Sequence, residues 1–111
     1  MTEAAQYIMV FVTTDSAEDA QRIARAVVTE QLAACVNITA PLHSVYRWQG
    51  QVECAEEHLL IMKSRAALFT ALSERVVALH SYDTPEVIAV PIQAGHSAYL
   101  SWITANTRAV P

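Results

Sequence analysis

The sequence has few glycines, few basic residues and no long apolar run. With only Gly50 and Gly95, it has no glycine-rich loop to wrap a phosphate, and it also lacks a nucleophile motif or a spaced Ser-His-Asp pattern. We therefore expect no enzyme. Lysine and arginine together number 7 and the formal net charge is −4, so no basic stripe is available to neutralise nucleic-acid phosphates. No apolar run approaches the roughly 18 residues of a membrane span, so we expect neither a nucleic-acid nor a membrane partner.

Cysteine is also scarce. Cys35 and Cys54 alone do not form a disulfide framework. The first residues, MTEAAQYIMV, lack the basic stretch that precedes the apolar core of a signal peptide. These features predict a cytoplasmic protein, and the length predicts a single domain over residues 1–111.

The composition is unusually apolar for so short a chain. Hydrophobic residues make up 53% and charged residues 16%, against a typical charged share of about 25%. A small domain buries a smaller fraction of its surface than a large one. The composition therefore favours association with other chains.

The segment from Cys35 to Ser64 predicts two long β-arms joined by a tight turn at Gln49-Gly50. Each arm would have about 13 residues, or roughly 43 Å at 3.3 Å per residue, whereas typical strands have about 5–6. One small sheet cannot cover arms of that length. Another copy of the same chain is the simplest partner for the uncovered part.

The remaining pattern predicts a ferredoxin-like split βαβ fold of the α+β class, with a C-terminal helix. A helix begins after a cap at Asp15 or Ser16. Right-handed crossovers place both long helices on one face of the sheet, and the other, apolar face must then be covered by a partner. The expected strands outside the two arms are residues 7–13 and 87–92, and the expected helices are residues 16–31, 65–79 and 96–106.

Five segments resemble the CutA family of divalent-ion tolerance proteins: LAACVNI from Leu32, SVYRWQGQVE from Ser44, EHLLIMKS from Glu57, ALHSYDTPEVIAVPI from Ala78 and YLSWI from Tyr99. The resemblance implies a homotrimer of ferredoxin-like subunits whose hairpins extend the sheets of their neighbours. It also implies a role in tolerance of divalent metal ions, with copper binding. Because the fold is similar to that of PII trimers, the alternative is a sensor or scaffold that binds a small molecule or a protein between subunits.

The candidate metal ligands are Cys35 and His80, since copper prefers sulfur and imidazole and the family often carries both residues. His80-Ser81-Tyr82 departs from the family's usual His-Pro-Tyr. A second set follows if Trp48 pairs with Gln51, because one ribbon face then carries His43, Cys54, Glu56 and His58. The plainer interpretations are a buried Cys35, a helix-capping His80 and a solvated ribbon face. No cofactor is expected to be obligatory; copper or another divalent cation is the candidate ligand.

A polar and aromatic group also falls within the family segments. Lys63 interrupts an apolar strand and must reach a carboxylate, for which Glu57 and Glu86 are candidates, or extend to water. The group could line a cleft between subunits, or it could be an interface salt-bridge network anchored by aromatic side chains. Its members are Tyr46, Trp48, Glu57, Lys63, Tyr82, Asp83 and Glu86.

Overall fold

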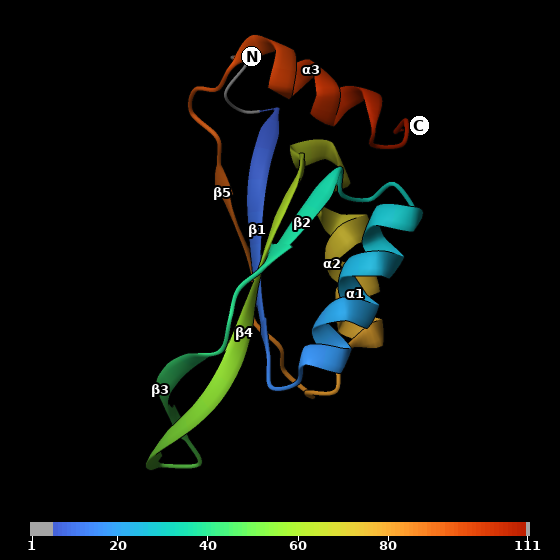
Figure 1. The fold of residues 1–111 in the computed structure, drawn as a ribbon. Helices are drawn as coiled ribbons and strands as arrows, with labels where there is room; N and C mark the ends of the chain where they lie inside the picture. The colour runs from blue at the N-terminus through green and yellow to red at the C-terminus, as the bar shows by residue number, and fades with distance from the viewer. Residues whose placement is uncertain (1–5, 111) are drawn as a thin grey trace.

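The computed structural model describes residues 6–110 and contains one antiparallel sheet with helices packed against it (Figure 1). The chain order is that of a split βαβ unit with a further helix at the end, as the sequence predicts. The elements are β1 (Tyr7–Thr14), α1 (Ala17–Thr29), β2 (Cys35–Ile38), β3 (Leu42–Trp48), β4 (Gln51–Arg65), the short 3-10 helix η2 (Ala66–Leu68), α2 (Phe69–Leu79), β5 (Val87–Pro91) and α3 (Ser97–Ala105).

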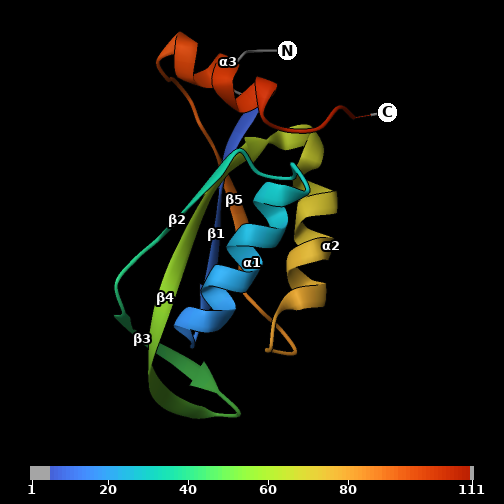
Figure 2. The same ribbon diagram turned by 45° about the vertical axis from the view of Figure 1, so that its right-hand side comes forward.

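The sheet has the strand order β2-β4-β1-β5, and β3 pairs with the far part of β4. All pairings are antiparallel. Helices α1 and α2 lie side by side against one face, and α3 crosses the end of the sheet where β1 begins (Figures 1 and 2). Pro91 has no N–H to donate, and it is the last residue of the edge strand β5. At that position the missing hydrogen bond disturbs the pairing of the sheet least. The ferredoxin-like fold predicted from the sequence is confirmed.

Helix α1 begins at a serine cap. The Oγ of Ser16 accepts a hydrogen bond from the backbone N–H of Asp19 at 2.9 Å, so Ser16 rather than Asp15 is the cap. The helix ends at Thr29, and Gln31 takes a φ of 60° to turn the chain towards β2. The backbone N–H groups of Leu32 and Ala33 then bond to the Val27 carbonyl, which satisfies the helix end.

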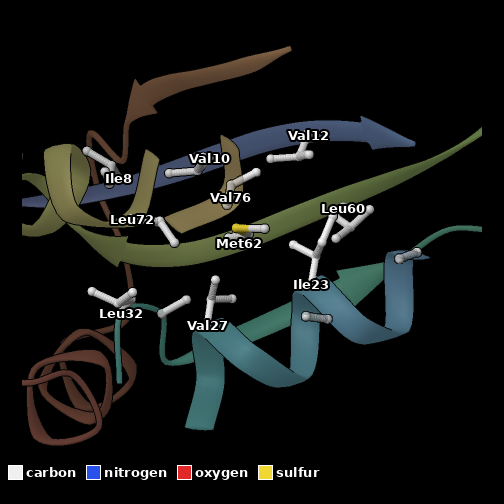
Figure 3. Close-up of a cluster of buried hydrophobic side chains, with 13 residues drawn as sticks. Ile8, Val10, Val12, Ile23, Val27, Leu32, Leu60, Met62, Leu72 and Val76 are labelled. Atoms are coloured by element: carbon white, nitrogen blue, oxygen red, sulfur yellow. The ribbon is translucent and has the colours of Figure 1, made fainter. Parts of the chain in front are cut away.

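The main core lies between the two long helices and the sheet (Figure 3). Alternate residues of β1 and β4 point towards the helices, and each helix presents one apolar stripe to them. The fully buried members of this core include Val10, Val12, Ile23, Val27, Leu60, Met62, Leu72 and Val76.

We expect Leu72→Ala to lower the free energy of unfolding by about 2–5 kcal/mol, because it leaves a cavity in this core. Urea denaturation would measure the loss. Val77→Ala is the matched control, since Val77 is exposed on the same helix and should change stability by no more than about 0.5 kcal/mol. Equal losses for the two variants would show that Leu72 is not a core residue in solution.

The long ribbon differs from the expectation in one respect: its first arm is two strands, β2 and β3, instead of one. Ile38 pairs with Leu60 whereas Leu42 pairs with Glu57, so three residues, 39–41, lie opposite two on β4. The extra residue is a β-bulge. Its physical causes are Pro41, which has no N–H for the ladder, and Thr39, whose Oγ1 accepts the Leu59 N–H at 3.0 Å.

The sheet face away from α1 and α2 has no cover from the described part of the chain, apart from α3 at one end. The register aligns Phe11 with Ile61 on one side and with Ile88 on the other, and Met9 with Lys63 and Val90. Ile88 is 53% exposed. We call this apolar surface of β1, β4 and β5 the open face.

Candidate functional site

A cavity of about 620 Å³ lies between the β3–β4 hairpin and the segment that joins α2 to β5. It contains every residue of the predicted polar and aromatic group except Lys63, and all of them come from one chain. The lining residues are Thr13, Ser44, Val45, Tyr46, Trp48, Glu57, Tyr82, Asp83, Thr84 and Glu86. We call it the hairpin cavity.

The hairpin register places the aromatic side chains of the cavity. Trp48 pairs with Gln51 across the turn at Gln49-Gly50, where Gln49 and Gly50 have φ angles of 50° and 78°. Tyr46 and Trp48 are two residues apart on β3, so both side chains point to the same side of the ribbon. This is the register on which the second metal-ligand set of the sequence analysis was conditional.

Glu57 is the buried carboxylate of the cavity, with only 8% of its surface exposed. The Tyr82 hydroxyl donates a hydrogen bond to its Oε2 at 2.8 Å. Burial, and after it this hydrogen bond and the Glu57 charge, raise the pKa of Tyr82 above its usual value. Tyr82 and Glu57 therefore join the α2–β5 segment to the hairpin.

His80 holds the beginning of that segment. Its Nδ1 accepts the Tyr82 backbone N–H at 3.1 Å, so its Nε2 carries the proton and donates to the Thr13 carbonyl at 2.7 Å. The ring also lies 4.6 Å from the Tyr82 ring, centroid to centroid. His80 is buried, and a metal could bind it only by displacing one of these hydrogen bonds. In this conformation His80 positions Tyr82.

Lys63 lies away from the hairpin cavity of its own chain, so its predicted place in a cleft between subunits stays a prediction. It stands on the open face, paired with Cys35 on β2 and Met9 on β1. Its ammonium group donates to the side-chain oxygen of Asn37, and neither Glu57 nor Glu86 is its counter-ion in the described structure. The family segment EHLLIMKS thus contributes Glu57 to the hairpin cavity and Lys63 to the open face.

Cys35 and His80 are not brought together within one chain. Lys63 pairs with Cys35 on one side and with Met9 on the other, so Cys35 lies level with Met9 across the sheet. The His80 ring bonds instead to the backbone carbonyl of Thr13. Those β1 positions are roughly 13 Å apart at 3.3 Å per residue. Cys35 is half-buried, with its Sγ 3.6 Å from the Tyr99 hydroxyl, and this hydrogen bond raises the pKa of Tyr99.

The alternative metal set lies on the predicted ribbon face, since His43 pairs with Glu56 and Val45 with Cys54. Residues that share a face do not necessarily surround a common metal position, however. Within residues 6–110, no group of three or more His, Cys, Asp and Glu side chains is arranged to hold a metal ion. The described residues of a single chain therefore do not fit an enclosed metal centre.

Sequence reasoning missed Thr13, Ser44, Val45 and Thr84 as lining residues of the cavity. Ser44 could have been found, because it lies two residues before Tyr46 on the same side of β3. Thr13 and Thr84 are brought in by the packing of the α2–β5 segment over β1, for which the sequence carries no local signal.

We expect the stability of the protein to fall as the pH rises above about 10, the tyrosine pKa of an unfolded chain. Because the folded-state pKa of Tyr82 is raised, the unfolded chain loses its proton first and the folded state is penalised. Urea midpoints between about pH 8 and pH 11 would show a smaller decline in Tyr82→Phe. A Tyr82→Phe profile parallel to that of the wild type would contradict the buried hydrogen bond.

Comparison with known proteins gives one consistent family. Residues 8–106 match the family model described as CutA1 divalent ion tolerance protein. The divalent-cation tolerance protein CutA of Thermus thermophilus is 50% identical over 99 residues, which are 89% of this chain and 96% of that protein. The chloroplastic protein CutA 1 of rice is 48% identical over 101 residues, or 91% of this chain. The chain spans little more than half of the rice and Arabidopsis relatives, 57% and 56% of their lengths.

Solved structures agree with the sequence matches. CutA1 from Oryza sativa has a TM-score of 0.91 at 46% identity and covers 96% of this chain and 98% of its own. The divalent cation tolerance protein from Thermus thermophilus has a TM-score of 0.90 at 48% identity, with coverages of 92% and 99%. A structure from Archaeoglobus fulgidus, named as a periplasmic divalent cation tolerance protein, is 39% identical with a TM-score of 0.88 and coverages of 90% and 97%. In the described part of this chain, no helix has the length and apolarity to cross a membrane. The chain belongs to the CutA1 divalent ion tolerance protein family.

Proposed function

We propose that this protein is a non-enzymatic, homotrimeric component of tolerance to divalent metal ions. The observation that carries the proposal is the family match over residues 8–106. The Thermus thermophilus relative, which is named for divalent-cation tolerance, is covered over 96% of its length. The likeness therefore extends through the core, the ribbon and the hairpin cavity.

The open face supports self-association. Apolar side chains of β1, β4 and β5 form it, and Ile88 is 53% exposed in a single chain. Isolated soluble proteins rarely leave a contiguous apolar sheet face in water. Copies of the same chain, packed around a three-fold axis, would cover it.

For metal binding we propose Cys35 as the principal copper ligand, completed by a group from a neighbouring chain. Cys35 stands at the end of the open face, so it would lie near the subunit boundary of a trimer. His80 would contribute only if it gave up a hydrogen bond, and the ribbon pair His43 and Cys54 is the alternative. Both cysteines are free, which suits a reducing compartment such as the cytoplasm.

A deletion strain tests the role directly. Dose curves for growth in excess copper, zinc and cobalt should shift to lower metal concentrations in the deletion strain, and the wild-type gene should restore them. A plasmid that carries Leu72→Ala serves as the folding control. Growth curves that coincide with and without the gene, for all three metals, would refute the proposal.

A second candidate function is a PII-like sensor or scaffold that binds a small molecule or a protein. The observation that favours it is the hairpin cavity, whose volume of about 620 Å³ lies within the range of roughly 300–1,000 Å³ typical of small-molecule sites. Its aromatic and acidic lining gives the few convergent polar groups that such sites use.

A further inference from the structure

The hairpin cavity carries negative charge without a compensating positive charge. Its described lining includes the carboxylates of Glu57, Asp83 and Glu86 and no lysine or arginine. Asp15 also contributes to the electrostatic effect that raises the pKa of Tyr82. A field of this sign concentrates cations in a cleft and repels anions. Phosphates and carboxylates are therefore poor candidates for the ligand.

Glu57 is a buried carboxylate that forms no ion pair with the described residues of its own chain. It is 8% exposed, and its Oε2 accepts the Tyr82 hydroxyl hydrogen bond. The ion pairs of the described residues join Arg22 to Asp19 and Arg75 to Glu30, and neither involves Glu57. A buried charge is costly unless it is paired. A cation that enters the cavity would supply the missing partner.

The rest of the lining favours an organic cation over a metal ion. The carboxylates do not form a metal-binding group among the described residues, and a volume of about 620 Å³ is far larger than a bare ion. Trp48 and Tyr46 expose 55% and 42% of their surfaces at the same cavity. Exposed aromatic faces beside carboxylates attract ammonium groups through cation–π contacts.

We propose that the hairpin cavity binds a small organic cation of the alkylammonium class. The ammonium group lies against Trp48 and Tyr46, with Glu57 as the nearest countercharge and Glu86 at the rim. This inference rests on the second candidate function, the small-molecule sensor, and names its ligand class.

Choline and 3,3-dimethylbutan-1-ol are a suitable probe pair, because they have nearly the same shape and only choline is charged. The sequence has two tryptophans, so Trp102→Phe leaves Trp48 as the sole tryptophan reporter. In that background we expect choline to change the Trp48 fluorescence saturably at millimolar concentration. The neutral alcohol should bind at least about tenfold more weakly, because it gains neither cation–π nor Coulombic attraction.

Three variants locate the response. Glu57→Gln should raise the Kd for choline at least about tenfold, because it removes the nearest countercharge of the trimethylammonium group. Glu86→Gln, at an exposed position that tolerates substitution, should raise it several-fold. Glu56→Gln is the matched control, since Glu56 is the adjacent residue but points to the other side of the ribbon with His43; it should leave the Kd unchanged within about twofold.

The proposal is overturned if choline and the alcohol bind alike, if the three variants behave alike, or if choline gives no saturable change. Growth curves of a Glu57→Gln strain in excess metal separate this inference from the tolerance function. Choline binding by the wild-type protein, together with normal tolerance in that strain, supports the inference without linking the cavity to metal tolerance. Lost tolerance in that strain without choline binding by the wild-type protein overturns the inference and leaves the tolerance function standing.

Discussion

Ile88→Glu is expected to abolish assembly and leave either single chains, of about a third of the wild-type mass, or unfolded protein. Ile88 lies on the open face, aligned with Phe11 in the middle of the sheet. In the assembled protein a glutamate there would be buried without a partner, and such a charge is strongly unfavourable. In the single chain the position is 53% exposed, so the substitution itself does not disturb the subunit core.

The control for this experiment is Val28→Glu. Val28 is 39% exposed and lies on α1, on the opposite side of the sheet from the open face. Light scattering after size-exclusion chromatography should give the wild-type mass for Val28→Glu and a smaller mass or unfolded protein for Ile88→Glu. A wild-type mass for both variants would remove the open face from the subunit interface.

Cys35→Ser is expected to weaken copper binding by at least about tenfold under reducing conditions, because a thiolate is the preferred soft ligand for Cu(I). Cys54→Ser should have a smaller effect, since Cys54 is exposed near the hairpin tip. Titrations monitored by competition with a chelator would measure the three affinities.

His80→Ala provides a further comparison in the same titration. Both ring nitrogens of His80 are already hydrogen-bonded, so its removal should lower stability more than copper affinity. If Cys54→Ser loses binding while Cys35→Ser does not, the ribbon face with His43 is the site and the assignment to Cys35 is wrong. If all variants bind weakly and alike, the protein has no specific copper site.

The local features of the fold were predictable from the sequence because local interactions determine them. The turn at Gln49-Gly50 determines the pairing of Trp48 with Gln51, and every later pair of the hairpin follows from it. The serine cap and the apolar stripe of α1 likewise need only neighbouring residues. The open face follows from the βαβ handedness rule.

The features that the sequence did not predict arise where distant segments meet. The bulge depends on Pro41 and also on Thr39, whose side chain bonds to Leu59 across the ribbon. Lys63 and Glu57 belong to one family segment, yet the register places Lys63 beside Cys35 and away from the hairpin cavity. The cavity itself exists within one chain because Tyr82 reaches Glu57, a contact between residues far apart in the sequence.

Sedimentation equilibrium of the wild-type protein at micromolar concentration tests most directly the claim that copies of this chain cover the open face. We predict a single species with three times the chain mass of 12.2 kDa. This mass should persist on dilution through the micromolar range, because a large apolar interface gives tight association. A folded species of 12.2 kDa would contradict the account, since the apolar face of β1, β4 and β5 would then be stable in water without a partner.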